Sequence, residues 1–297
     1  MKVLIGGSSG LIGSALVAAL SQQDHQVARL LRTSAPRGSA DLCWNPDTGA
    51  LDTTRLDGFD AVVHLGGRNL ASGRWTKALK TDIRESRVRS TQLLATALSA
   101  LRNPPKVFIS ASGVSIYGNR GAEILTEASS FGAGFLAEVA REWEEATRPA
   151  AERAIRVVNL RLGLVLSTQG GALAKMLLPF KFGLGGVVGN GDQYWSWIAL
   201  EDTVRAIHHA LVTDSLSGPL NLVSPNPVTN REFTRALGAA LGRPTIFPVP
   251  AFVARIALGE MADEALLAST RVLPARLLAS GFKFSHDDLH AFLLALK

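Results

Sequence analysis

The chain has 297 residues, 47% of them hydrophobic, and a formal net charge of +6. That length suits one large α/β unit, or such a unit with an appended lobe, and the composition excludes a disordered chain. Cys43 is the only cysteine, which excludes disulfides within the chain and cysteine-rich zinc sites. The modest, dispersed charge favours anionic small molecules over nucleic acid as partners.

No apolar run reaches the roughly 18 residues of a membrane span. A glycine-rich motif begins at residue 6, close behind Met1-Lys2, so we expect no removable leader. These observations predict a cytoplasmic protein without a membrane partner.

A glycine-rich turn follows the first apolar run. Val3–Ile5 predicts a strand, residues 6–13 read Gly-Gly-Ser-Ser-Gly-Leu-Ile-Gly, and Ser14–Gln22 predicts a helix. A dinucleotide pyrophosphate binds at such a junction, because the helix N-terminus offers free N–H groups and a partial positive charge. The first glycine of the pattern permits the tight turn, the second lets phosphates approach the backbone, and the third lets helix and strand pack closely. The predicted contacts here are Gly7, Ser9, Gly10, Leu11, Ile12 and Gly13.

Apolar strands then alternate with longer helical patterns. The predicted strands are Gln26–Leu31, Ala61–Leu65, Val107–Ser110, Val157–Leu160 and Leu220–Leu222, and the predicted crossover helices are Arg84–Leu101 and Leu136–Arg148. Near-continuous apolar strands that alternate with helices indicate a parallel sheet covered on both faces. We therefore predict an α/β fold with a Rossmann-type, doubly wound parallel sheet.

Ligands of such sheets bind beyond the carboxyl ends of the strands, so residues that follow those ends should converge on one crevice. The second strand ends at Leu31-Arg32, with no Asp or Glu between residues 26 and 36. An acidic residue there would favour NAD, whereas an arginine attracts the 2′-phosphate of NADP. Arg32 therefore predicts NADP(H), with a solvated turn arginine as the alternative. The other predicted cofactor contacts in the crevice are Leu31, Leu65, Gly66, Gly67, Asp82, Ser110 and Arg161.

The second half of the chain has a different character. Glycines cluster at residues 170–171 and 183–191, and Thr229–Glu232 has the pattern of a capping box that opens a helix ending at Gly242. We predict a Rossmann domain over residues 1–169 and a smaller, mainly helical substrate lobe over residues 170–297. Residues 201–223 are expected to return to the main sheet.

Together these motifs resemble an extended short-chain dehydrogenase/reductase and, more narrowly, the YfcH-type epimerase family of sugar-nucleotide epimerases. The matching segments are residues 7–13, 73–76, 86–88, 161–167, 178–180, 183–186, 189–193, 195–198 and 281–282. The resemblance implies a Rossmann sheet with a C-terminal substrate lobe, a family-specific segment over about residues 247–296, and a small-molecule substrate such as a nucleotide-linked sugar. It also implies that Arg87, in Ser86-Arg87-Val88, is a second phosphate contact rather than part of a solvated basic face.

Short-chain dehydrogenases normally use a serine or threonine, a tyrosine, and a lysine four residues beyond the tyrosine. The lysine lowers the pKa of the tyrosine and holds the nicotinamide ribose. Ser112 matches the serine, but neither Tyr117 nor Tyr194 is followed by a lysine at that spacing. The usual pair aligns with Phe135 and Val139. Since a phenylalanine cannot transfer a proton, the standard dyad is absent.

Other residues offer only partial replacements. Tyr117 follows Ser112 by five residues and is the candidate catalytic tyrosine, with a pocket wall as the alternative. The stretch 192–197 suits the face of a nucleobase or sugar, or else aromatic packing of the lobe on the sheet. His208 and His209 are adjacent on a predicted helix and point apart, so they predict no metal site.

Two functions of different classes remain open. The first is an NADP(H)-dependent oxidoreductase or epimerase for a small polar or nucleotide-linked substrate, in which Ser112 polarises an oxygen and the proton donor is not identified. The second is a non-catalytic NADP(H)-binding sensor or partner-binding protein. The cofactor motif supports both functions. The missing dyad favours the second, whereas the glycine and tryptophan motifs that face the crevice favour the first, and on balance we expect an enzyme. The sequence leaves both a monomer and a homodimer open.

Overall fold

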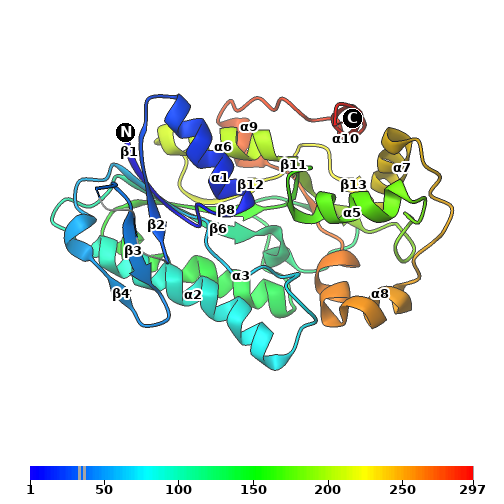
Figure 1. The fold of residues 1–297 in the computed structure, drawn as a ribbon, viewed down its shortest axis with the longest axis horizontal. Coiled ribbons are helices and arrows are strands. Elements are labelled where there is room, and N and C mark those ends of the chain that lie inside the picture. The colour runs from blue at the N-terminus through cyan, green and yellow to red at the C-terminus, as the bar shows by residue number, and fades with distance from the viewer. Residues whose placement is uncertain (33–34, 36–37, 297) are drawn as a thin grey trace.

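An eight-stranded sheet forms the centre of the computed structural model, which describes residues 1–32, 35 and 38–296. In spatial order the strands are β12 (Gly218–Leu222), β8 (Arg156–Leu162), β6 (Val107–Gly113), β5 (Ala61–His64), β1 (Lys2–Gly6), β2 (Gln26–Leu31), β3 (Leu42–Asn45) and β4 (Ala50–Leu51) (Figure 1). All neighbours pair in parallel except β3 and β4. The predicted Rossmann-type α/β fold is confirmed. Chain order reverses between β1 and β5, and ligands of open α/β sheets bind at such a point.

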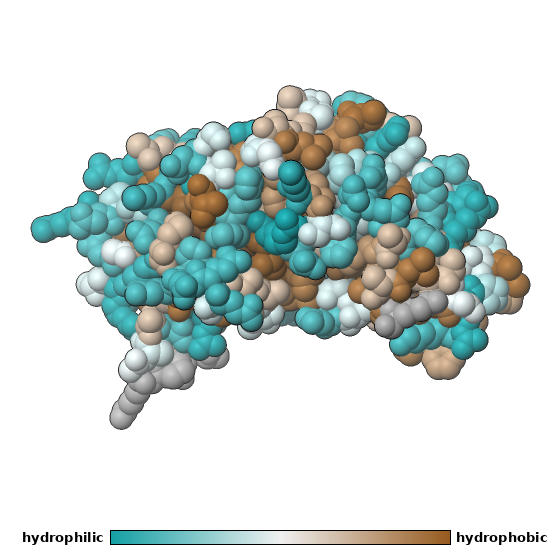
Figure 2. Space-filling view, turned by 90° about the horizontal axis from the view of Figure 1, so that it is seen from above, coloured by the Kyte–Doolittle hydropathy of each residue, from teal (hydrophilic) through white to brown (hydrophobic). Residues whose placement is uncertain are grey.

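Helices cover both faces of this sheet. Side chains of a strand alternate between faces, so Val3 and Ile5 join the core on one side, whereas Leu4 joins the core on the other. The first side is covered by α1 (Leu11–Gln22), α6 (Leu200–Val212) and α9 (Ala275–Ala279). The opposite side carries α2 (Lys77–Ser99), α3 (Phe135–Glu145) and α4 (Arg148–Glu152) (Figure 1). From above, hydrophobic residues lie in separate groups between hydrophilic ones (Figure 2).

Local signals predicted several elements well. The strand predicted at Gln26–Leu31 has the same bounds as β2. The capping box forms: the Glu232 N–H donates to Thr229 Oγ1 at 3.2 Å, and the Thr229 N–H donates to Glu232 Oε2 at 2.7 Å. It opens α7 (Asn230–Leu241), which ends at Gly242 with φ +63°. These predictions are confirmed.

Other bounds differ for local reasons. Helix α2 begins at Lys77 rather than Arg84, because Thr76 caps it by accepting the Leu79 N–H at 3.2 Å. Helix α3 stops at Glu145, and the separate helix α4 begins at Arg148, with Pro149 in its first turn, where the N–H that proline lacks would have no partner within the helix. Strand β3 was not predicted, because four residues are too short to show a clear alternation.

The second half builds a smaller unit against the carboxyl edge of the sheet. Its helices are α5 (Gly171–Lys181), α7, α8 (Ala251–Leu258) and α10 (Leu289–Leu294). Two short pairs join the units: β9 (Leu164–Leu166) with β11 (Trp197–Ala199), and β7 (Ile124–Leu125) with β14 (Arg271–Val272). A third, β10 (Tyr194–Trp195) with β13 (Val228–Thr229), lies within the second half. Between α6 and α7 the chain returns to the main sheet as β12.

Candidate functional site

The glycine turn between β1 and α1 shows why each of its three glycines is there. Gly7 has φ +77°, and a Cβ on it would stand 2.7 Å from the Gly66 nitrogen. A Cβ on Gly13 would overlap the Gly7 carbonyl. Among the described residues, a Cβ on Gly10 would meet Gly7 O alone, at 3.4 Å. The fold therefore requires the outer two glycines, and the middle one keeps the surface of the turn open for close approach.

The start of α1 fits an anion. Its N-cap residue is Gly10, no side chain caps it, and its first turn contains no acidic residue. The amides at the start of a helix have no partner within the helix, and they carry the positive end of its dipole. Ser9 is exposed on the turn, and Leu11 and Ile12 are half-buried at the helix start. A pyrophosphate fits these residues as the sequence predicts.

Arg32 lies exposed at the carboxyl end of β2, after the half-buried Leu31. Asp41, an acidic residue on the same edge of the sheet, is engaged elsewhere, because Arg29 Nη2 donates to its Oδ2 at 2.6 Å. Burial, and then the charge of Arg32, lower the pKa of His64 to about 4. Arg32 therefore presents its charge at the carboxyl end of β2, the position from which an arginine can reach the 2′-phosphate of NADP(H).

Arg87 lies at the other side of the crevice. A Cβ on Gly67 would stand 3.2 Å from Arg87 Cζ, so the guanidinium packs against the loop of residues 65–67 that follows β5. It donates to Ile83 O at 2.9 Å and lies 5.1 Å from the Trp143 ring centre. Burial lowers its pKa to about 10, which leaves it a cation at neutral pH. No carboxylate within the described residues pairs with it, so N–H groups remain for an anion.

A cavity of about 400 Å³ opens beyond the carboxyl ends of β6 and β8. One wall is the inner face of α3, a second is α5, and a third is the chain from the end of α8 to residue 270. Residues from the strands, α3 and the C-terminal segment include Ser112, Gly113, Leu162, Leu136, Val139, Ala140, Trp143, Leu258, Met261, Glu264 and Leu266. Arg87 also lines this space, so the cavity adjoins the glycine crevice.

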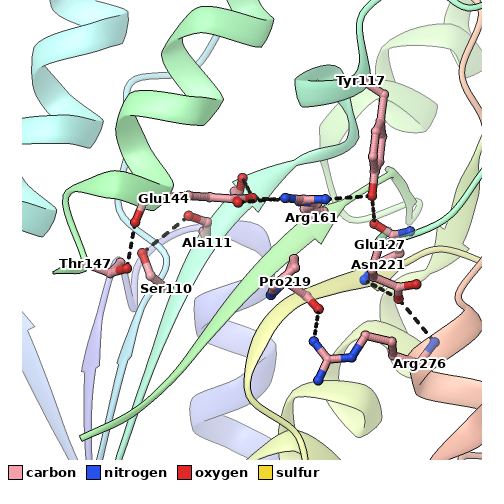
Figure 3. Close-up of polar contacts among 11 residues, drawn as sticks. Ser110, Ala111, Tyr117, Glu127, Glu144, Thr147, Arg161, Pro219, Asn221 and Arg276 are labelled. Carbon is pink, nitrogen blue, oxygen red and sulfur yellow. Dashed lines mark hydrogen bonds and ion pairs between the residues drawn. The ribbon is translucent and has the colours of Figure 1, made fainter. Parts of the chain in front are cut away.

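Behind Ser112 lies a buried polar network. Ser112 Oγ donates to Glu144 Oε1 at 2.8 Å, and Arg161 donates to both oxygens of that carboxylate, each at 2.8 Å. Arg161 also donates to the Tyr117 hydroxyl at 2.9 Å, which donates to Asn221 Oδ1 at 2.8 Å (Figure 3). Burial lowers the pKa of Arg161, but the hydrogen bonds to Glu144 and Tyr117 and the charges of these two groups together raise it by more, so the net pKa lies above its ordinary value. Arg161 is therefore a cation, and it forms an ion pair with the Glu144 carboxylate.

This network fixes what Ser112 can do. An ionised carboxylate only accepts hydrogen bonds, so the hydroxyl proton of Ser112 points to Glu144. The lone pairs of Ser112 Oγ remain for the cavity. From the sequence, Ser112 was predicted to polarise a substrate oxygen, whereas in this geometry its hydroxyl donates to Glu144 and can accept from the cavity.

Of the predicted site residues, Ser112 and Arg87 line the cavity, whereas four others belong neither to the cavity lining nor to the loops and turn of the crevice. Tyr117 is fully buried within the network, and burial raises its pKa, partly offset by Arg161. Arg161 is enclosed with it, and its side chain is 3% exposed. Ser110 is buried within β6, and Asp82 is exposed to solvent on α2. The expectation that Tyr117 faces the pocket is not met, because the turn after β6 directs it toward β12 instead.

The positions that align with the missing dyad, Phe135 and Val139, face different ways. Phe135 points away from the cavity: the Lys80 ammonium lies 4.4 Å from its ring centre, and the Trp75 ring 5.4 Å away. Val139 lines the cavity, and the residues of α3 that do so form two pairs four positions apart, Leu136 with Ala140 and Val139 with Trp143. Neither pair contains a tyrosine or a lysine.

Glu264 is a site residue that the sequence analysis missed. It lies in a helical turn over Ala262–Leu266, and its two oxygens accept the N–H groups of Phe135 at 3.2 Å and Leu136 at 3.0 Å. It therefore caps α3 from the C-terminal segment. Gly134, with φ +113°, leaves room, since a Cβ there would stand 2.7 Å from the carboxylate. No local pattern links residues 130 positions apart.

The remaining candidates are structural. Trp197 is fully buried and stacks on Phe292 at 5.7 Å, and its indole N–H donates to Asn226 O. His208 and His209 point apart as predicted, toward His25 and Ser280 respectively. The part of the chain that the structure describes holds no group of three or more potential metal-ligating side chains. None of its helices is both long and apolar enough to cross a membrane.

The sheet order, the glycine turn and the adjoining cavity define an extended Rossmann-type dinucleotide-binding protein. The chain belongs to the NAD dependent epimerase/dehydratase family, which it matches over residues 3–222. Residues 249–296 match a second family, described as Domain of unknown function (DUF1731). The resemblance found in the sequence is thereby confirmed.

Two curated relatives span nearly the whole chain. Epimerase family protein ML0860 of Mycobacterium leprae is 47% identical over 287 residues, which cover 97% of this chain and 92% of the relative. Human epimerase family protein SDR39U1 is 36% identical over 296 residues, which cover 99% of this chain and 98% of the relative.

Solved structures agree with the fold. A crystal structure of human SDR39U1 (isoform 2) with NADPH has a TM-score of 0.92 at 35% identity, covering 100% of this chain and 99% of the other. A structure described as the nucleoside-diphosphate sugar epimerase from Corynebacterium glutamicum has a TM-score of 0.81 at 37% identity. The match covers 100% of this chain and 57% of the Corynebacterium glutamicum chain.

Proposed function

We propose that this chain binds NADP(H) at the glycine turn and acts as an oxidoreductase or epimerase on a small molecule held in the cavity. The NADPH of the human relative supports the choice of cofactor. The uncapped start of α1 suits the pyrophosphate, and the exposed Arg32 suits the 2′-phosphate. A bound dinucleotide would supply the hydride chemistry, while this chain's residues bind and orient.

The position of Arg87 carries the proposal. Its guanidinium packs against Gly67 in the cofactor crevice and also lines the cavity. A cation without a carboxylate partner among the described residues suits a phosphate of the cofactor, and it joins the cofactor site to the space beyond it. Because one residue contacts both the cofactor crevice and the cavity, a molecule in the cavity would lie next to the bound cofactor. This arrangement favours an enzyme.

One observation favours the alternative, a non-catalytic NADP(H)-binding sensor or partner-binding protein. The cavity-lining residues within the described chain include no tyrosine, lysine or histidine. A reaction in this space would therefore rely on Ser112, on Glu264 or on water for proton transfer. We further propose a cytoplasmic location, in keeping with the single cysteine.

Two measurements test the proposal in sequence. Fluorescence titration should give clearly tighter binding for NADPH than for NADH. A panel of alcohols, carbonyl compounds and nucleotide sugars should then include one that changes NADP(H) absorbance in an enzyme-dependent way. Equal affinity for the two cofactors would refute the cofactor assignment. Tight NADPH binding without turnover on any panel member would favour the sensor.

A further inference from the structure

Apolar side chains form most of the cavity wall. Leu136, Val139 and Ala140 line it from α3, Met176 from α5, and Leu258 and Met261 from the C-terminal segment. Trp143 and Trp195 add two aromatic rings. Such walls gain free energy by removing apolar ligand surface from water, at about 25 cal/mol per Å².

Most polar groups of this wall are already used inside the protein. The Trp143 indole N–H donates to Thr91 Oγ1 at 2.8 Å, and the Trp195 indole N–H donates to Leu266 O at 3.2 Å. Ser196 Oγ donates to Thr270 O at 2.7 Å. Both oxygens of Glu264 receive backbone N–H groups of α3. The two tryptophans therefore offer a ligand only their rings.

The polar groups that remain lie mainly at one end of the cavity. Ser112 lies near the end of β6, Ser115 lies in the turn that follows, and Arg87 lies toward the cofactor crevice. Ser112 presents lone pairs, because its O–H group donates to Glu144, whereas Ser115 and Arg87 can donate. A hydroxyl, which both donates and accepts, therefore suits this end of the cavity.

A sugar is a poor match for this arrangement. It carries a hydroxyl on nearly every carbon, and each one buried without a partner costs about 1–3 kcal/mol. We propose that the cavity takes a mainly apolar molecule with a single alcohol group, which donates to Ser112 while its carbon skeleton lies between α3 and the C-terminal segment. This inference rests on the proposed function in treating the cavity as the substrate site.

Calorimetric titration of the full-length protein tests the ligand class, both without cofactor and with saturating NADPH. The probes are 1-phenylethanol, its hydrocarbon analogue ethylbenzene, its ketone acetophenone, and UDP-glucose. We expect 1-phenylethanol to bind about two- to tenfold more tightly than either analogue, because one hydrogen bond adds about 0.5–1.5 kcal/mol. Along the series 2-butanol to 2-octanol, each added CH₂ should tighten binding about fourfold until the cavity is full.

Two variants and one control variant locate the effect. Ser112→Ala should remove the preference for 1-phenylethanol over ethylbenzene, whereas the surface variant Ser99→Ala should keep it. Val139→Asn should weaken every apolar probe, with the melting temperature of each variant recorded to verify folding. UDP-glucose binding more tightly than all the alcohols, or affinity independent of chain length, would overturn the inference.

The cofactor titration keeps the two proposals separate. If NADPH does not bind but the alcohols follow the expected order, the proposed function fails and the assignment of the cavity stands. If NADPH binds and the alcohols do not, the proposed cofactor site stands and the substrate class is wrong.

Discussion

The glycine turn and the cavity recognise ligands by opposite means. The turn offers backbone amides and two arginines, Arg32 and Arg87, around a surface from which side chains are absent. The cavity offers side chains, most of them apolar, and its polar groups are largely paired within the protein. Charge and hydrogen bonding dominate the first region, whereas apolar burial dominates the second.

Because the two regions differ in this way, mutations should disrupt cofactor binding and substrate binding separately. The glycine turn is formed by fewer than about ten consecutive residues, which rest on the core of the sheet. The cavity depends on contacts between distant parts of the chain, such as Glu264 with the start of α3. Variants in one region should therefore leave the other almost unchanged.

The largest effect is expected from Gly10→Val. The branched side chain would occupy the surface where the pyrophosphate should lie, so NADPH affinity should fall at least about a thousandfold. Gly10→Ala, whose Cβ meets Gly7 O at an ordinary 3.4 Å, should fold normally and lose less affinity. Calorimetry measures the binding, and a cavity probe serves as the control. Normal NADPH binding by the valine variant would place the cofactor elsewhere.

Arg161→Met tests whether the buried network is structural. It would leave the Glu144 carboxylate, whose side chain is 12% exposed, without its partner, which costs about 3–5 kcal/mol of unfolding free energy. Urea denaturation measures that loss, and the double variant with Glu144→Leu should recover much of it. The folded fraction should bind NADPH as the wild type does. A selective loss of NADPH affinity would instead make Arg161 the cofactor contact predicted from the sequence.

Arg32→Ala acts on the cofactor side alone. A charge-assisted hydrogen bond contributes about 1.5–3 kcal/mol, so NADPH should bind about ten- to a hundredfold more weakly and NADH about equally well. The solvent-exposed Arg102→Ala is the matched control for loss of one positive charge. Equal losses for both cofactors would contradict the role of Arg32.

His64 couples the turn region to pH. Its ring lies beneath Gly6 and Gly66, and its pKa is lowered to about 4 from an ordinary 6.5. The unfolded chain therefore binds this proton more readily than the folded chain, so stability is lost as pH falls from about 6.5 toward 4. Between pH 7.5 and pH 5, protonation of His64 should lower the unfolding free energy by about 2 kcal/mol.

The pH effect is measured as a difference between two proteins. Unfolding free energies of the wild type and of His64→Asn are compared across that pH range, so that other titrating groups cancel. The wild type should lose about 2 kcal/mol more than the variant. Parallel curves would show that His64 is not held neutral in the folded state.

The sequence predicted the glycine turn much better than it predicted the cavity. The turn, the strands and the capping box at Thr229 depend on neighbours in the chain, and patterns of glycine, apolar and capping residues report such neighbours directly. The choice of Arg32 followed from its place after a strand. Fold and cofactor turn could therefore be predicted.

The cavity could not be predicted from the sequence, because its chemistry depends on contacts between residues far apart in the chain. Nothing near Ser112 indicates that Glu144 will accept its hydrogen bond, and nothing near Phe135 indicates a cap from residue 264. Tyr117 looked catalytic by spacing, yet its hydroxyl bonds to Arg161 and Asn221. Helical phase was the remaining weakness, because one step along a helix turns a side chain by about 100°, and of the two aligned positions Val139 lines the cavity whereas Phe135 does not.

Glu264→Ala gives the smallest expected effect and tests the link between the two halves of the cavity. It removes the acceptor for two amides of α3, and losing a helix cap costs about 0.5–2 kcal/mol. Unfolding free energy and hydrogen exchange at the Phe135 and Leu136 amides measure the loss. Glu138→Ala is the matched control, because that first-turn carboxylate instead reaches outward to Arg84 at 3.4 Å. Apolar probes should bind the Glu264 variant more weakly while NADPH affinity stays unchanged, since α3 shapes the cavity and not the glycine turn. A parallel loss of NADPH affinity would show that the C-terminal segment supports both regions and would end the separation between them.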